Sequence, residues 1–133
     1  MRALKAVNAF TLPELLLSAA ILSYSLSVVL ATYVNSIALN DASRNLSIAV
    51  SHAQLVMEDI RNTTFASVAT NITNGNWDWN TATIGTKGLT ALKSESIDTS
   101  LTGSNPLDIT VTFSWNDLNG RSRSQALKTS VSG

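Results

Sequence analysis

One ionisable residue of this chain lies where a charge is costly, and its surroundings indicate what it does. Glu14 stands at the edge of an apolar stretch, Phe10 to Asn40, and the 26 residues between Glu14 and Asp41 carry no charge. A carboxylate drawn unpaired into a bilayer costs a few kcal/mol. Cutting the chain after Ala9 would create an amino group on Phe10, about one helical turn from Glu14. That amine is the charge that Glu14 lacks.

The sequence lacks the residues that nucleophilic or metal-dependent catalysis needs. The chain has one histidine, His52, and no cysteine, whereas such sites combine nucleophile, base and ligand side chains. We expect His52 to be satisfied by a neighbour or to face solvent. Glu95, Asp98 and Asp108 are interpreted as the solvated face of strands. We therefore predict no catalytic residue, no cofactor and no metal, and we do not expect an enzyme.

A loop-like stretch, Asn71 to Gly88, contains the one pattern that suggests calcium. Oxygen-bearing side chains alternate there with two tryptophans, Trp77 and Trp79; these side chains are Asn74, Asn76, Asp78 and Asn80. Only one of the four is a carboxylate, and the central glycine and closing glutamate of an EF-hand loop are missing. A solvated loop whose tryptophans pack on a sheet or on a neighbouring molecule is favoured.

The element that positions Glu14 is a helix long enough to span a membrane. A helix rises about 1.5 Å per residue and a bilayer core takes roughly 20 mostly apolar residues, so residues 10–40 suffice. Arg2 and Lys5 precede this stretch and mark its cytoplasmic end, which places the following domain outside the cytoplasm. Small residues would allow such helices to approach closely: Ser18, Ala19, Ala20, Ser23, Ser25 and Ser27.

Residues 1–9 have the features of a processing leader but not those of an ordinary secretory signal. They contain two basic residues and no acidic one, and the small residue Ala9 precedes the apolar stretch instead of following it. A cut after Ala9 leaves the spanning helix on the mature protein. Pro13 fits a helix that starts at Phe10, because the first four N–H groups of a helix have no intrahelical acceptor.

The sequence AFTLPELL, residues 9–16, resembles the type IV prepilin motif: a small residue, a phenylalanine, and a glutamate fifth in the mature chain. The family comprises the pilins and pseudopilins of type IV pili, type II secretion and related machines, and it usually has glycine where this chain has Ala9. The resemblance implies cleavage between Ala9 and Phe10 by a prepilin peptidase, and N-methylation of Phe10. It also implies an inner-membrane precursor, an assembly platform in that membrane, and a filament in which Glu14 meets the Phe10 amine of an adjacent subunit.

The helical pattern continues beyond Asn40 in amphipathic form. Apolar residues recur at spacings of three and four, which defines one face of a helix: Ala42, Leu46, Ala49, Ala53, Val56 and Ile60. We predict one helix from about Phe10 to about Asn62, whose second half, residues 41–62, packs on a sheet. Glu58 and Arg61 are spaced to pair on its outer side. A free coiled coil is the alternative. Half of these apolar positions are alanines, whose small side chains suit close packing on a sheet better than a coiled-coil interface.

The remaining residues predict a loop and then a small antiparallel sheet. Residues 63–91 are expected to be loop, and residues 92–131 a three-stranded meander that begins around Leu92 to Ile97. Leu107 to Trp115 alternate apolar and polar side chains without error. A turn follows in which Gly120 is free to take positive φ, and Arg121 to Val131 returns. The predicted fold class is α+β, a long N-terminal helix packed on a small antiparallel sheet, which is pilin-like.

The charge balance, the missing cysteine and the small size of the domain bear on which function is favoured. Nine basic and nine acidic side chains give the precursor no net charge. Loss of Arg2 and Lys5 would leave seven basic against nine acidic side chains, which predicts no general affinity for nucleic acid or for anionic lipid. The basic cluster of Arg121, Arg123 and Lys128 is interpreted as an edge-strand charge guard. Contact with nucleic-acid phosphate, in a minor pilin of a DNA-uptake system, is the less favoured alternative.

Among members of the family that the motif resembles, the missing cysteine, the short domain and the tryptophan-containing hairpin favour a minor pilin. A type II secretion pseudopilin is the runner-up, and a major pilin comes third. From another class, a signal-anchored periplasmic binding module would keep residues 1–9.

Overall fold

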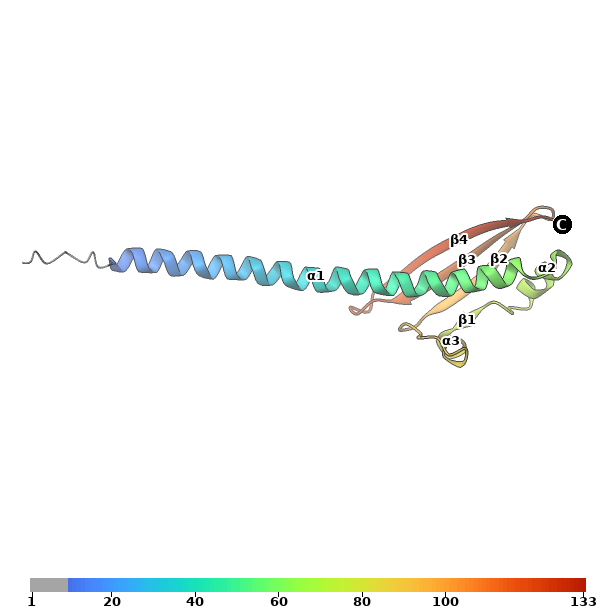
Figure 1. Cartoon of the computed structure of the whole chain (residues 1–133), viewed down its shortest axis with the longest axis horizontal. Helices are drawn as coiled ribbons and strands as arrows, with labels where there is room; N and C mark the ends of the chain where they lie inside the picture. The colour runs from blue at the N-terminus through green and yellow to red at the C-terminus, as the bar shows by residue number, and fades with distance from the viewer. Residues whose placement is uncertain (1–9) are drawn as a thin grey trace, which may run out of the picture. The chain divides into compact units, whose positions relative to one another are not determined.

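The computed structural model describes residues 10–133 and has an α+β architecture (Figure 1). A 50-residue helix, α1 (Leu12–Arg61), comes first, and four antiparallel strands and two short helices follow it. The chain divides after Asn40 into an N-terminal unit and a C-terminal domain, Asp41–Gly133. The prediction of a long N-terminal helix on a small antiparallel sheet is confirmed.

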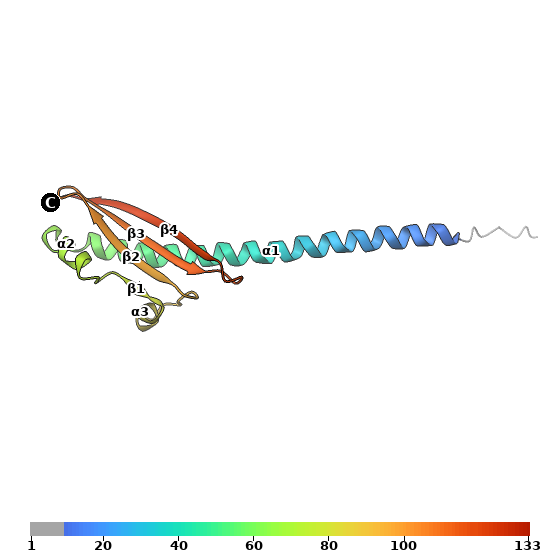
Figure 2. The ribbon, with the colours of Figure 1, turned by 180° about the vertical axis from the view of Figure 1, so that it is seen from behind.

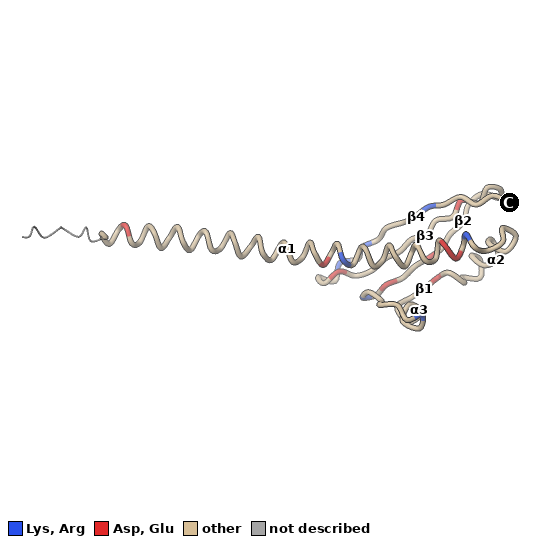
Figure 3. Tube along the Cα trace, viewed as in Figure 1, with Lys and Arg blue, Asp and Glu red and all other residues tan. Residues whose placement is uncertain are grey.

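The described part of the N-terminal unit is the beginning of α1. The helix starts at Leu12, two residues later than predicted, and the Thr11 carbonyl accepts the N–H groups of Glu14 and Leu15 at 3.0 and 3.1 Å. Pro13 lies in this first turn, where its missing N–H removes no hydrogen bond. Beyond Glu14 the helix is free of charge as far as Asp41 (Figure 3). This stretch is long and apolar enough to cross a membrane.

The C-terminal domain is a sheet covered on one face by the later turns of α1 (Figures 1 and 2). Its strands run in the order β1 (Trp79–Asn80), β2 (Ser96–Thr102), β3 (Leu107–Asn116) and β4 (Ser122–Val131). The sheet therefore has four strands, not the three that were predicted. The strand expected around residues 92–97 is β2, which begins only at Ser96.

The central strand β3 has the predicted alternation. Its odd-numbered residues from Leu107 to Trp115 are buried under α1, and the even-numbered ones face outward with partial or full exposure. Strand β4 pairs with it in the predicted hairpin, Val111 opposite Leu127. Gly120 in the connecting turn has a φ of 75°, as expected. In the preceding turn only glycine fits at Gly103, because a Cβ there would lie 2.8 Å from the Pro106 carbonyl oxygen.

Residues 63–91 are not the loop that was predicted. They form α2 (Phe65–Thr73), strand β1 and α3 (Thr81–Thr86). Val68 and Ile72 lie four residues apart on α2 and are both buried, as is Ile84 on α3. These helices were not predicted because they are rich in Thr and Asn, and such residues favour turns and caps. Asn80 illustrates this, since its side chain caps α3 by accepting the Thr83 N–H at 2.9 Å.

The apolar stripe of α1 is shorter than predicted, and it includes two unexpected residues. The structure buries Ala49, Ala53, Val56 and Ile60, together with His52 and Met57. Ala42 and Leu46 are exposed, so their assignment to the packed face was wrong. Glu58 and Arg61 form no ion pair in the described chain. Arg61 donates instead to the Thr129 hydroxyl of β4 at 3.2 Å.

Candidate functional site

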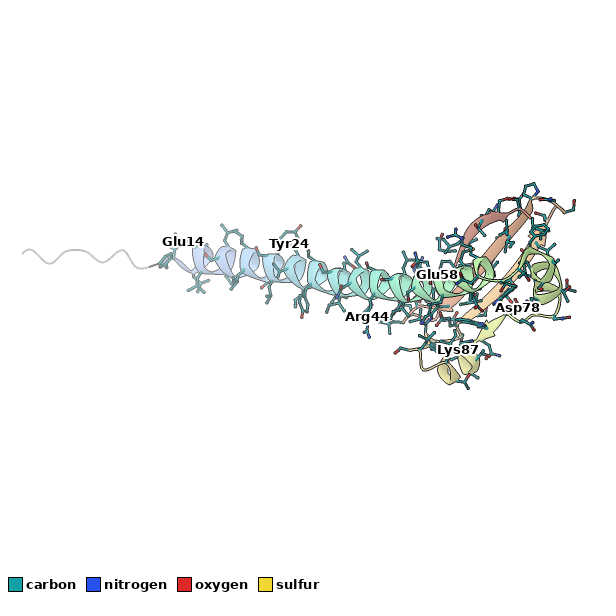
Figure 4. The ribbon with its side chains drawn as sticks, turned by 45° about the vertical axis from the view of Figure 1, so that its right-hand side comes forward. Glu14, Tyr24, Arg44, Glu58, Asp78 and Lys87 are labelled. Atoms are coloured by element: carbon teal, nitrogen blue, oxygen red, sulfur yellow. The ribbon has the colours of Figure 1, made fainter. Side chains whose placement is uncertain are left out.

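The predicted assembly site lies at the start of α1. Phe10 precedes the helix with 75% of its surface exposed, and Glu14 is exposed on the first turn (Figure 4). Both groups are therefore accessible to a neighbouring molecule. Ala9 and the rest of the leader lie outside the described residues, so cleavage after Ala9 and methylation of Phe10 stay predictions.

The serines predicted to pack between helices have their hydroxyls satisfied within α1. Ser18, Ser23, Ser25 and Ser27 each donate to the carbonyl four residues earlier, at 2.8 to 2.9 Å. Thr32 and Ser36, which were not among the predicted packing residues, do the same at 2.9 Å. A hydroxyl bonded in this way adds no unsatisfied donor to an apolar environment. The small side chains remain exposed together with Ala19 and Ala20, which leaves room for close helix approach.

The large apolar side chains of this helix are exposed as well. Leu16, Ile21 and Val29, for example, each present more than half of their surface. A continuous exposed apolar surface of this extent marks contact with lipid or with another protein. Within the described chain, the beginning of α1 can thus contact a bilayer or like helices, and it has no protein cover of its own.

The C-terminal domain contains a buried polar pair that the sequence did not reveal. The Nδ1 atom of His52 lies 2.8 Å from Oε1 of Glu95, and both side chains are almost wholly inaccessible. The second carboxylate oxygen accepts the Leu92 N–H at 2.7 Å. The expectation that His52 is satisfied by a neighbour is confirmed. Placing Glu95 on a solvated strand face was wrong, because it precedes β2 and points into the core.

The residues that suggested calcium have structural partners in the fold. Oδ1 of Asp78 accepts both the N–H and the hydroxyl of Thr99, each at 2.8 Å. Trp77 is buried and donates its indole N–H to Asp59 at 2.8 Å. Trp79 is buried too, with the Lys87 ammonium 4.5 Å from its ring centre. Residues 10–133 contain no group of three or more metal-ligating side chains.

The basic cluster lies on the exposed edge strand β4 and its preceding turn. Arg121, Arg123 and Lys128 are all exposed there, as an edge-strand charge guard requires. Arg123 also contacts Asp117, with Nη2 3.3 Å from Oδ2. The Arg121 N–H donates to Oδ1 at 2.8 Å. This bond, the Asn119 N–H and the Arg123 charge lower the pKa of Asp117 below its ordinary value of 3.8.

A pocket of about 300 Å³ opens beside this turn, within the C-terminal domain. Its walls come from three segments that are distant in sequence: α1, the residues before β2, and the β3–β4 turn. The residues that give it its chemistry are Arg44, Ile48, Leu92, Lys93, Asn116 and Leu118. This pocket could not be predicted from the sequence, because only the fold brings its three walls together.

Fold and site together define a chain with a membrane-competent N-terminal helix and a small α+β domain built on the continuation of that helix. No protein-family model, curated protein or solved structure matches it. The functional proposal therefore depends on the residues and their geometry.

Proposed function

We propose that this chain is a structural subunit, a minor pilin of a type IV pilus-type filament, and not an enzyme. One observation carries the proposal. A single helix begins two residues after Phe10, holds Glu14 in its first turn, runs uncharged to Asp41, and continues into the face that packs on the sheet. The exposed apolar surface of such a helix can contact lipid in the membrane and can contact like helices in a filament.

In this proposal the precursor waits in the inner membrane as a single-pass protein with its C-terminal domain outside the cytoplasm. A prepilin peptidase removes residues 1–9, Phe10 is N-methylated, and an assembly platform moves the subunit from lipid into the filament. Glu14 then meets the Phe10 amine of an adjacent subunit. Two charges about 4 Å apart attract by roughly 4 kcal/mol at an effective dielectric constant near 20, before desolvation. Such a pair favours one register over others more surely than it adds stability.

Four ionisable residues of the C-terminal domain support a structural role. His52 and Glu95 are engaged with each other, and Asp78 and Asp117 accept hydrogen bonds that hold β2 and a turn. We therefore propose no cofactor, no metal and no nucleic-acid partner. A type II secretion pseudopilin would use the same helix and differs in the machine it serves. An uncleaved, signal-anchored binding module is the alternative from another class.

The proposal predicts that Glu14→Gln impairs filament incorporation and leaves membrane insertion and leader cleavage intact. Insertion depends on the apolar stretch, and an amide costs less than a carboxylate in lipid. Assembly depends on the carboxylate, which Gln lacks, so the variant should accumulate in membranes. The measurement is the fraction of subunit in sheared filaments against that in membranes, with intact mass reporting cleavage in both.

Asp41→Asn is the matched control, because it removes the carboxylate at the other end of the uncharged stretch. It should assemble like the wild type. Equal incorporation of Glu14→Gln and wild type would contradict the assembly role of Glu14. Residues 1–9 still attached to assembled protein would contradict the pilin assignment and favour the signal-anchored module.

A further inference from the structure

The pocket in the C-terminal domain lies close along the chain to the uncharged stretch of α1. Its first basic residue, Arg44, is three residues beyond Asp41 on the same helix. From the middle of the uncharged stretch to Arg44 is about 25 Å of helical rise, while the headgroup layer of a bilayer ends roughly 20 to 22 Å from its centre. Helical side chains tilt toward the N-terminus, so the long Arg44 side chain can reach back into that layer.

The pocket presents two positive charges that have no partner among residues 10–133. Arg44 and Lys93 are exposed, and in the described chain neither side chain makes an ion pair or a hydrogen bond. The nearest carboxylate in the pocket, Asp117, already accepts hydrogen bonds from Asn119, Arg121 and Arg123. The pocket therefore offers two solvent-exposed cations beside one carboxylate that is already hydrogen-bonded. Figure 3 shows basic and acidic residues close together at this end of the domain.

The other walls are suited to a ligand that is polar at one end and apolar at the other. Asn116 and Asn45 offer amide groups, whereas Ile48, Ala91 and Leu92 are apolar. Leu118, on the β3–β4 turn, exposes 74% of its surface although it belongs to no packed core. An exposed leucine next to two free cations is a typical feature of surfaces that contact the membrane interface.

From this arrangement we infer that the pocket binds the phosphate of an anionic phospholipid such as phosphatidylglycerol, at the extracytoplasmic surface of the membrane. Arg44 and Lys93 hold the phosphate oxygens, and Leu118 contacts the glycerol. A subunit held in this way keeps its domain against the bilayer until assembly removes it. The inference rests on the proposed function, in which the uncharged part of α1 lies in a bilayer, the C-terminal domain lies outside the cytoplasm, and assembly removes the subunit from the membrane.

The test compares two double variants of the full chain that remove the same charge. Arg44→Gln/Lys93→Gln alters the pocket, and Arg61→Gln/Lys128→Gln removes two exposed basic residues outside it. Binding of phosphatidylglycerol to the detergent-solubilised protein is titrated by native mass spectrometry, with diacylglycerol as the lipid that lacks phosphate. A cation near an anionic surface contributes about a fivefold gain in affinity. We expect the pocket variant, which lacks two such cations, to lose about 25-fold and the control variant less than about twofold.

Three further outcomes decide against the inference. Equal losses in the two variants would mean general charge attraction, and equal binding of diacylglycerol would mean that phosphate is not recognised. Displacement of the lipid by millimolar inorganic phosphate would assign the pocket to a soluble phosphate-bearing ligand. If near-ultraviolet circular dichroism shows that the pocket variant has lost its fold, Lys93→Gln is compared with Lys128→Gln, and the same expectations apply with about a fivefold loss.

Resistance of the protein to alkaline extraction from phosphatidylglycerol-containing vesicles separates this inference from the proposed function. A chain that fails to insert would contradict both. A chain that inserts, yet binds phosphatidylglycerol equally well in both variants, would overturn the lipid site and leave the filament proposal intact.

Discussion

His52 and Glu95 are the ionisable side chains that the described chain buries, with 3% and 2% of their surfaces exposed. Burial of such groups is costly unless each finds a hydrogen-bonding partner. Here the pair joins α1 to the segment before β2, and the same carboxylate holds the Leu92 N–H. The Thr81 hydroxyl donates to the Glu95 carbonyl oxygen at 3.2 Å, so α3 is tied to the same point. The pair thus fixes the register of three segments.

Glu95→Ala should destabilise the protein by about 3 kcal/mol, because it leaves His52 and the Leu92 N–H buried without a partner. The measurement is thermal unfolding followed by near-ultraviolet circular dichroism, which reports on the three buried tryptophans. The control His52→Leu/Glu95→Leu replaces both partners and should recover part of the loss. A loss as large in the double variant as in Glu95→Ala would mean that packing, and not pairing, dominates at this site.

Asp117 predicts a pH dependence of stability in the acid range. Its pKa is lowered in the folded state, first of all because the Arg121 N–H donates to it. The unfolded chain therefore binds the proton more readily, so the stabilisation is present above about pH 4 and is lost as pH falls through the folded pKa. Asp117→Asn should flatten this dependence without abolishing it, since other carboxylates also titrate. The check is the melting temperature at about pH 6 and about pH 3 for both proteins; equal slopes would contradict the assignment.

Among the elements, α1 and β3 could be predicted because their signals are local. The uncharged stretch and the alternation of Leu107 to Trp115 depend only on neighbours in sequence. The burial of Glu95 could not be predicted, since its partner lies 43 residues away. For the same reason the pocket of Arg44 and Lys93 was missed. The exposure of Leu46 has a similar cause, because periodicity shows which face of a helix is apolar but not where the sheet beneath it ends.

The corrected boundary of the stripe can be tested with two alanine substitutions on α1. Ile60 is fully buried and Leu46 is 40% exposed, although the sequence pattern treats them alike. Ile60→Ala should cost about 3 kcal/mol, whereas Leu46→Ala should cost less than about 1 kcal/mol. Unfolding of the full chain in detergent, followed by the tryptophan signal, gives both values. Similar costs would mean that the sheet supports the helix as far as Leu46.

In the chain as a whole, one helix serves two environments. Before Asn40 its apolar side chains are exposed, and from Ala49 to Ile60 one face of it is buried in the C-terminal domain. The domain core is built from that face, α2, α3 and the sheet, and it includes no residue before Ala49. The hydrophobic core of the C-terminal domain therefore lies wholly within residues 41–133.

This division predicts which truncations fold. Removing residues 1–39 keeps the whole core, so residues 40–133 should form a soluble, folded monomer. Removing residues 1–61 deletes α1 and uncovers the buried face of β3, whose side chains from Leu107 to Trp115 are 0% to 5% exposed in the intact domain. A fully apolar strand face in water favours aggregation, so this second fragment should precipitate or form large species. The measurements are size-exclusion chromatography and circular dichroism of both fragments. An unfolded 40–133 fragment would show that the domain depends on the membrane half of α1. A soluble, folded 62–133 fragment would show that the core does not need the helix.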